Sequence, residues 1–327
     1  MIKSKPRKNS RKPKKYNYGN EEIIRQLMNV FSNVNYELKK KNLELKSCKT
    51  IGVDYRITRY LSSGGFGNVS LAIDTRTEKN IIVKEIEIHR SKIYEYLKFV
   101  KNELKHLAFF SELIPEYICP LICIDIKVDI SPKLIIVMET CGESMYKVIT
   151  DIISRNIPKP SLDIVLTWFH NIATALHIMH SNNILHLDIK PENILVRDNG
   201  NIAIIDFGLS QSIDEYNISR IPVGTPRYVA PEIVSRTFIN SGKSDIYSLG
   251  VTFNYLTDMY PEIRHLVRDM INPNVLLRPT ALEVRQKILE LMITREKGNK
   301  ISEEIKKPTK LVRPTRSPTP VGRKKYY

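Results

Sequence analysis

The sequence predicts an α+β protein with two lobes, and three observations support this. Short runs rich in β-forming residues, separated by Gly-rich or polar turns, occupy residues 55–88. After Gly142 the apolar residues recur mostly at helical spacing. The length of 327 residues is enough for two lobes with substantial cores. A β-rich first part followed by a helical second part is typical of α+β architecture.

The individual elements follow in chain order. The pattern predicts strands at 55–62, 68–74 and 80–88, a helix at 92–111 and a buried strand at 134–139. Beyond Gly142 it predicts helices at 161–182, 243–257, 261–271 and 280–293, interrupted by a strand pair at 194–197 and 202–206. The predicted main domain covers 54–293.

A further amphipathic helix is predicted at 20–46, with Asn20 as a plausible N-cap. Its apolar residues recur mostly at steps of three and four: Ile23, Ile24, Leu27, Met28, Phe31 and Leu38. We favour an extra helix packed on the main domain over a helix that binds a partner. The extension is taken as 19–48.

The net charge of +16 lies in the two ends of the chain. Residues 1–18 carry eight Lys or Arg and no acid, and residues 297–327 carry ten against two Glu. We therefore expect basic disordered tails at 1–18 and 294–327. They suit an acidic partner or nucleic acid, or act as nuclear import signals; a solubilising tail without a partner is the alternative. The near-neutral body excludes a basic nucleic-acid platform.

The four cysteines, Cys48, Cys119, Cys123 and Cys141, form no C-x-x-C motif and no zinc spacing with His. We interpret them as reduced thiols in an intracellular protein, nuclear or cytoplasmic. No apolar run reaches the roughly 18 residues of a membrane span, and no secretory signal is recognisable.

Two motifs in the β-rich part carry chemistry. The segment 62–69, S-S-G-G-F-G-N-V, brings backbone N–H groups close to a phosphate, although Gly-rich hairpins are common. Lys84 ends an apolar strand and needs an anionic partner, for which Glu103 on the next helix is the candidate. A lysine whose ammonium reaches solvent is the alternative for this motif taken alone.

Two more motifs lie in the second part. In H-L-D-I-K-P-E-N, Asp188 can accept a hydroxyl proton, Lys190 can neutralise phosphate charge, and Asn193 can hold a metal. Asp206 of D-F-G follows a strand and is placed to bind Mg²⁺. Taken alone, each also fits an ordinary polar turn.

In this order, and followed by A-P-E at 230–232, the motifs resemble the eukaryotic-type protein kinase superfamily. The resemblance covers about residues 54–293 and implies a bilobal protein-kinase fold. It implies a β-rich N-lobe (54–138) with one main helix, a hinge (139–143) and a mostly helical C-lobe (144–293). It also implies ATP and Mg²⁺ as cofactors. The expected substrate is protein Ser or Thr, because Lys190 and Thr225 match the Ser/Thr type of the family. The catalytic loop has the H-L-D form.

The resemblance also assigns roles to residues. Lys84 would bind the α- and β-phosphates and pair with Glu103, Asp188 would accept the substrate proton, and Asn193 and Asp206 would hold Mg²⁺. Lys190 would stabilise the transferring phosphate, and Glu232 would brace Arg278. Leu107, Phe207, His186 and Asp245 would form a stacked spine. The nucleotide would contact Ser62, Ser63, Gly64, Gly65, Phe66, Gly67, Val69, Ile82, Met138, Glu139, Cys141 and Leu195.

The chain departs from the family pattern at four places. Leu187 stands where most members have an Arg that receives an activation-loop phosphate, so we expect activity without phosphorylation at Ser210, Ser212, Tyr216 or Ser219. Ser62 replaces the first Gly of the loop, and Ile82 replaces an Ala over the adenine. The C-lobe is shortened after the helix at 245–257, which leaves substrate recognition open.

Three alternatives remain. A pseudokinase or scaffold that presents the basic tails is the second hypothesis, although every residue that the chemistry requires is present. A small-molecule kinase is disfavoured by the segment G-T-P-R-Y-V-A-P-E. The helix near 281–294 is expected to pack on the C-lobe, with a calmodulin-type target as the alternative. We expect a monomer.

Overall fold

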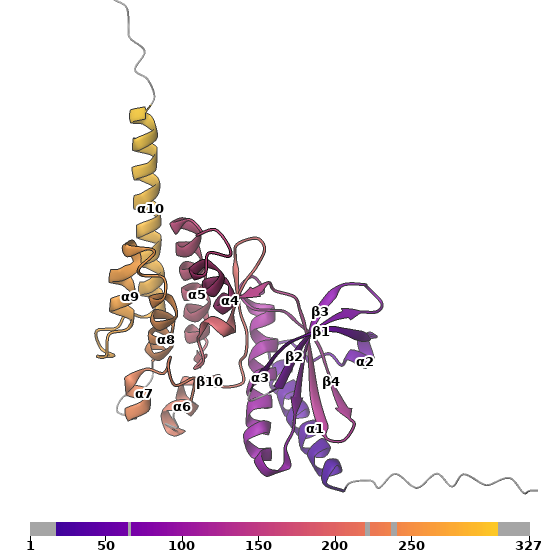
Figure 1. Cartoon of the computed structure of the whole chain (residues 1–327). Helices are drawn as coiled ribbons and strands as arrows, with labels where there is room; N and C mark the ends of the chain where they lie inside the picture. The colour runs from indigo at the N-terminus through magenta and orange to yellow at the C-terminus, as the bar shows by residue number, and fades with distance from the viewer. Residues whose placement is uncertain (1–17, 65–66, 220–222, 237–240, 307–327) are drawn as a thin grey trace, which may run out of the picture.

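The computed structural model describes residues 18–64, 67–219, 223–236 and 241–306. The basic tails at 1–17 and 307–327, together with Gly65 and Phe66, lie outside these residues. The described chain has a β-rich lobe and a helical lobe, joined by the segment after β5 (Pro132–Glu139). Figure 1 shows the two lobes side by side. The prediction of a bilobal α+β fold is confirmed.

The first lobe is a five-stranded antiparallel sheet in the order β1-β2-β3-β5-β4. Its remaining strands are β1 (Tyr55–Gly64), β2 (Gly67–Asp74), β3 (Asn80–Glu87) and β4 (Leu121–Val128). The edge strand β4 was not predicted, although L-I-C-I-D-I-K-V has the alternation of a strand. The main helix α3 (Ile93–Leu113) follows the short turn η1 (Arg90–Lys92).

The second lobe is mostly helical. Its main helices are α4 (Met145–Ile153), α5 (Leu162–Ser181), α8 (Lys243–Asn254), α9 (Arg264–Met270) and α10 (Ala281–Lys306). Short helices are η2 (Pro191–Asn193), α6 (Ile213–Ser219), α7 (Pro231–Ser235) and η3 (Pro261–Ile263). Small sheets are formed by β6 (Glu143–Ser144), β8 (Ile194–Val196) and β9 (Ile202–Ile204), and by β7 (Ile184–Leu185) with β10 (Gln211–Ser212).

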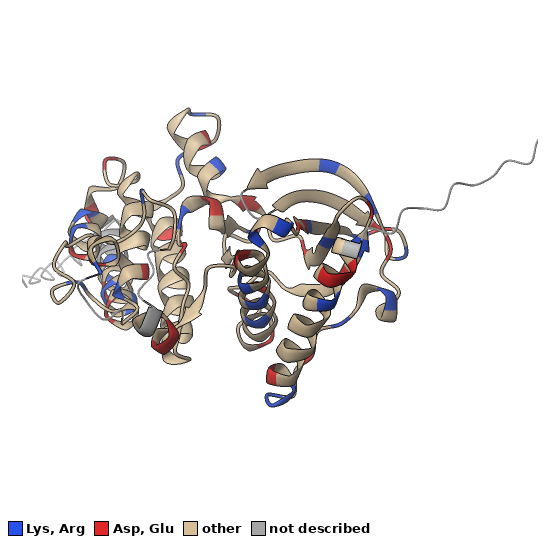
Figure 2. Cartoon of the chain, turned by 90° about the horizontal axis from the view of Figure 1, so that it is seen from below, with Lys and Arg blue, Asp and Glu red and all other residues tan. Residues whose placement is uncertain are grey.

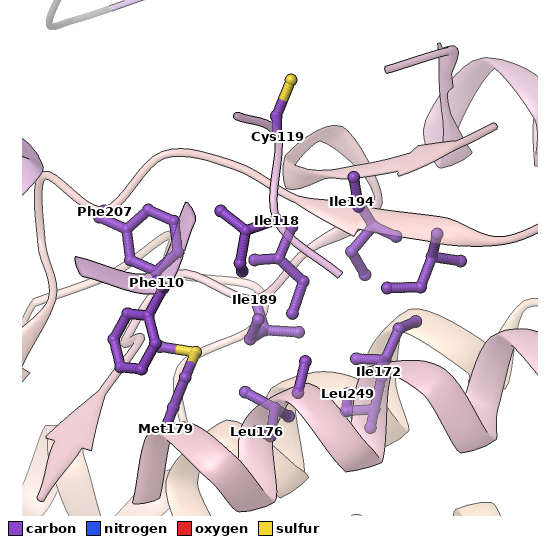
Figure 3. Close-up of a cluster of buried hydrophobic side chains, with 14 of the residues drawn as sticks. Phe110, Ile118, Cys119, Ile172, Leu176, Met179, Ile189, Ile194, Phe207 and Leu249 are labelled. Atoms are coloured by element: carbon purple, nitrogen blue, oxygen red, sulfur yellow. The ribbon is translucent and has the colours of Figure 1, made fainter. Parts of the chain in front are cut away.

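One continuous apolar core crosses from the sheet lobe to the helical lobe. Figure 3 shows Phe110 of α3 and Phe207 beside Met179 of α5, with Leu176 and Leu249 deeper in the helical lobe. Phe110 and Phe207 stack with ring centroids 5.9 Å apart. The D-F-G turn therefore lies within the core that joins the two lobes, so its position depends on both.

The N-terminal extension forms α1 (Tyr18–Lys39) and α2 (Cys48–Ile51). The predicted helix ends earlier than residue 46, and α1 packs against α3, as expected for an extra helix of the main domain. The expectation of four reduced thiols is wrong, because Cys48 of α2 and Cys123 of β4 form a disulfide. These residues are 75 positions apart, and the fold brings them together. Cys119 and Cys141 remain free and buried.

The last helix, α10, continues past residue 293, where the basic tail was expected to begin. A capping box starts it: the Thr280 backbone N–H donates to Glu283 Oε2 (2.7 Å), and Glu283 N–H donates to Thr280 Oγ1 (3.3 Å). It packs on α5, as expected for a helix of the C-lobe.

One described helix, α5, is long and apolar enough to span a membrane, which the sequence analysis did not expect. In the most apolar stretch of α5, 61% is buried inside the fold, as in the core helix of a globular domain. Its apolar residues are therefore accounted for by packing within the helical lobe.

Candidate active site

Three charged side chains from different elements meet at the junction of the lobes. The Lys84 ammonium on β3 lies 2.7 Å from Glu103 Oε1 on α3 and 3.0 Å from Asp206 Oδ1. Lys84 is paired in register with Val69 of β2 and Ile136 of β5, in the middle of the sheet. The strand and the helix thus hold a cation between two carboxylates that are far apart in sequence.

The pKa values in this cluster follow from burial and charge. Burial alone would lower the pKa of Lys84, but Asp206 and Glu103 together raise it above its usual value. Burial raises the pKa of Glu103, against the opposing effect of Lys84. Burial would also raise the pKa of Asp206, but the Lys84 ammonium holds it below the usual range. The cluster therefore keeps one fixed positive charge beside Asp206.

The D-F-G turn is packed tightly against α3. A side chain at Gly208 would overlap the ring of Phe99, so the close approach of α3 requires glycine here. Asp206 has a φ of 69°, a left-handed conformation that is uncommon for residues other than glycine. The turn thereby points the Asp206 carboxylate at Lys84.

A second cluster surrounds Asp188. Its Oδ2 accepts hydrogen bonds from Lys190 Nζ (2.7 Å) and Asn193 Nδ2 (2.9 Å). Its Oδ1 accepts from the backbone N–H (3.1 Å) and the hydroxyl (2.7 Å) of Thr225. Lys190 Nζ also donates to Thr225 Oγ1 at 2.8 Å. The buried carboxylate is thus oriented by a cation, an amide and a hydroxyl.

The two clusters are joined by a backbone hydrogen bond beside the β8–β9 pair. The Ile205 N–H donates to the carbonyl of Asn193 at 3.0 Å, so Asn193, which directly precedes β8, lies close to Asp206, which follows β9. One brings an amide oxygen and the other a carboxylate, the oxygen ligands that Mg²⁺ prefers. With Lys84 beside them to meet phosphate, these residues fit a magnesium–nucleotide complex.

A buried histidine supports the loop that carries Asp188. The His186 ring lies 5.3 Å from that of Phe207, and its Nδ1 accepts the Asp188 N–H at 3.3 Å. The Asp245 carboxylate on α8 accepts the N–H groups of His186 (2.9 Å) and Leu187 (2.8 Å). It also contacts His180 Nε2 at 2.9 Å, a partner that no motif in the sequence indicated.

The described residues expected around the nucleotide lie on or beside β1, β2, β3, β5 and β8. Ile82 pairs with Met138 across β3 and β5, and Leu195 lies on β8 in the helical lobe. Cys141 is buried, and Glu139 is exposed. Ser62, Ser63 and Gly64 end β1, and Gly67 and Val69 begin β2. Gly67 has a φ of 149°, and a side chain there would overlap the Glu85 carbonyl.

The Leu187 side chain lies in an apolar cluster. The cluster contains Leu185, Leu187, Tyr216, Ala230 and Ile233. Leu187 has a φ of 67° and is 7% exposed. The sequence showed that the Leu187 side chain could not bind phosphate. That Tyr216 belongs to the same buried cluster could not be inferred, because 29 positions separate the two residues. We call this group the Leu187 cluster.

The expected brace in the helical lobe is present. The buried Arg278 guanidinium contacts Glu232 at 2.6 and 3.0 Å, and it also donates to the Asn272 and Lys243 carbonyls. Its guanidinium lies 5.0 Å from the centre of the Tyr247 ring. This bidentate pair anchors α7, which contributes Ile233 to the Leu187 cluster.

Comparison with known proteins agrees with this geometry. Residues 55–307 match the protein kinase domain family. The chain is 27% identical over 266 residues to CBL-interacting serine/threonine-protein kinase 10 of Arabidopsis thaliana, covering 71% of this chain and 52% of that protein. It is 30% identical over 198 residues to the carbon catabolite-derepressing protein kinase of Candida glabrata, covering 61% of this chain and 31% of that one.

Serine/threonine-protein kinase pakH of Dictyostelium discoideum is 29% identical over 216 residues, covering 64% of this chain and 38% of that protein. The aligned regions thus span about half or less of the length of these three relatives. The family match covers most of the sequence and includes the Lys84 and Asp188 clusters. The chain therefore belongs to the protein kinase domain family.

Proposed function

We propose that this chain is a serine/threonine protein kinase, which transfers the γ-phosphate of ATP to a Ser or Thr hydroxyl of a protein. The observation that carries this is the assembled pair of clusters, one around Lys84 and one around Asp188, linked by the backbone of Asn193 and Ile205. Every residue type that phosphoryl transfer needs is in contact with another member of the site.

Each side chain has a proposed task. Lys84 binds the α- and β-phosphates, and Glu103 holds its ammonium in place. Asp188 accepts the proton of the substrate hydroxyl, while Lys190 stabilises charge on the transferred phosphate. Thr225 contacts both groups, as expected for a Ser/Thr substrate.

Asn193 and Asp206 would hold Mg²⁺ through their side-chain oxygens. The bound ion supplies charge neutralisation at the phosphates. The nucleotide base would lie between Ile82 and Leu195, beside the backbone of Glu139 and Cys141. These assignments rest on the positions of the residues and on family membership.

We also propose that activity does not require activation-loop phosphorylation. Leu187 and Tyr216 belong to one buried apolar cluster, so apolar packing would hold the segment that a phosphate–arginine pair holds in other members. Two expected phosphate acceptors are buried: Ser210 donates its hydroxyl to the His186 carbonyl at 3.2 Å, and Tyr216 is 3% exposed.

Transfer of labelled γ-phosphate from Mg-ATP to a mixed pool of basic proteins and peptides tests this function. Asp188→Asn should reduce turnover by about 10²–10⁴-fold, because the proton acceptor is lost. Asp198→Asn, the same change at an exposed position in the β8–β9 turn, should leave turnover unchanged. Label on Ser or Thr in the products completes the test.

Two outcomes would contradict the proposal. A wild type as silent as Asp188→Asn, with no thermal shift on adding Mg-ATP, would favour a scaffold that presents the basic tails. Loss of activity after phosphatase treatment, reproduced by an activation-loop Ser→Ala variant, would overturn the phosphorylation-independent part alone.

The proposal also covers the location of the enzyme, its oligomeric state and its partners. An intracellular monomer with protein substrates suits the family, and the tails are suited to nucleic acid or an acidic partner. Over the described residues, both signs of charge are spread across both lobes, which leaves the tails as the basic regions (Figure 2). The Cys48–Cys123 bond is more typical of oxidising compartments, so thiol trapping in cells is the direct check.

A further inference from the structure

The N-terminal extension lies against the helix that carries Glu103. Four residues of α1 are buried with α3 in the main core: Ile23, Leu27, Val34 and Leu38, none more than 3% exposed. Their spacing places them on one face of α1. Figure 1 shows α1 beside α3 on the same side of the sheet. The extension is therefore integral to the sheet lobe and contributes to the core around α3.

Polar contacts add to this packing at the C-terminal end of α1. The Lys41 ammonium lies 3.7 Å from the centre of the Phe109 ring of α3. Glu37 is close enough to Lys101 and Lys105 of α3 for their charges to lower the pKa of Glu37, although its pairing with Lys40 lowers it more. The contact between the helices thus extends along α3 beyond the turn that bears Glu103.

Both ends of α1 are attached to the β4–β5 hairpin. Near its start, Asn20 Nδ2 donates to the Ile130 carbonyl at 3.1 Å. After its end, the Ile124 N–H donates to the Lys46 carbonyl at 2.9 Å, and Ser47 bridges to Ile124 in parallel. The Cys48–Cys123 disulfide follows directly. The extension is therefore tied to the edge strand β4 through residues 46–48 and to the β4–β5 turn through Asn20.

We propose that α1 is an intramolecular brace that positions α3, so that Glu103 stays in contact with Lys84 without a partner protein. Leu27, Val34 and Leu38 are its positioning residues, and the links of residues 46–48 to β4 fix its end. The inference rests on the role proposed for Glu103. It goes beyond that role by assigning its control to a segment that precedes the matched family region.

A double-mutant cycle tests the brace. Leu27→Ala removes a fully buried side chain from the contact, and Met28→Ala changes a neighbour that is 52% exposed. In the wild-type background, Leu27→Ala should lower the turnover number about tenfold, while Met28→Ala should not. In the Glu103→Gln background, Leu27→Ala should cause less than about a twofold further loss. An equal loss in both backgrounds would overturn the proposal, since a general loss of stability acts in both.

Hydrogen exchange gives a second readout that does not depend on catalysis. Leu27→Ala should speed exchange of the α3 amides around Glu103 and leave those of α5 unchanged. Unchanged exchange in α3 would overturn the brace. If the wild type transfers no phosphate, the proposed function fails, and the exchange result alone then decides whether α1 holds α3.

Discussion

The two sides of the candidate site are held by different forces. On the sheet side, Lys84 is fixed by two carboxylates at 2.7 and 3.0 Å. On the side of the activation segment, Leu187 packs among Tyr216, Ala230 and Ile233. One arrangement depends on charge, and the other on the removal of apolar surface from water.

This difference separates chemistry from conformation. Phosphate has to be met by charge, so the Lys84 cluster contains groups that a nucleotide can engage. The buried members of the Leu187 cluster are apolar or aromatic, and Leu187 itself offers no charge to a phosphate. Packing of this kind is what the proposed phosphorylation-independent activity requires of the segment.

Lys84→Met should have the largest effect on the charged side. Turnover should fall at least about 100-fold, because the ammonium group that would bind the nucleotide phosphates is lost. Stability should fall by about 3–5 kcal/mol, because the buried Glu103 and the half-buried Asp206 would be left together without their cation. Phosphate transfer and urea unfolding measure the two effects. Lys79→Met, at an exposed position, is the control, and equal results for both variants would contradict the charged-cluster interpretation.

Leu187→Ala should break the apolar side without touching charge. It should lower the unfolding free energy by about 2–5 kcal/mol, the usual range for a buried leucine. Urea denaturation measures this, with Leu276→Ala, at 71% exposure, as the matched control. A loss no greater than that of the control would mean that the Leu187 cluster contributes little to holding the segment.

A smaller, pH-dependent loss of stability is expected on the sheet side of the site, where α3 carries a buried histidine. Burial, reinforced by Lys105 and His186, lowers the pKa of His106 on α3 to about 3. The unfolded chain binds a proton near pH 6.5 whereas the folded chain does not, so stability is retained above that pH and lost as the pH falls. Between pH 7.5 and 5, this histidine should account for a loss of about 2 kcal/mol.

Urea unfolding of His106→Leu at both pH values checks the effect. The variant should lose less stability on acidification than the wild type. His265→Leu, at an exposed position, should follow the wild type. If the two variants respond alike to acid, His106 is not the group responsible.

Much of the architecture could be predicted because its signals are local. Short runs of β-forming residues between turns indicated the strands β1 to β3, and helical periodicity indicated α3, α5 and α8 close to their observed bounds. The edge strand β4 was overlooked despite its alternation. The short helices α6 and α7 gave too few residues for a periodic pattern.

By itself, the sequence determined the order of the chemical groups: a lysine on a strand, an aspartate and an asparagine five residues apart, and a second aspartate after a strand. Leu187 alone also excluded a phosphate–arginine contact at that position. Only the tertiary structure decided that Cys48 bonds Cys123, that Tyr216 joins the buried cluster of Leu187 and that α1 lies on α3. Periodicity reports which face of an element is apolar, but the partner of that face depends on packing between segments that are distant along the chain.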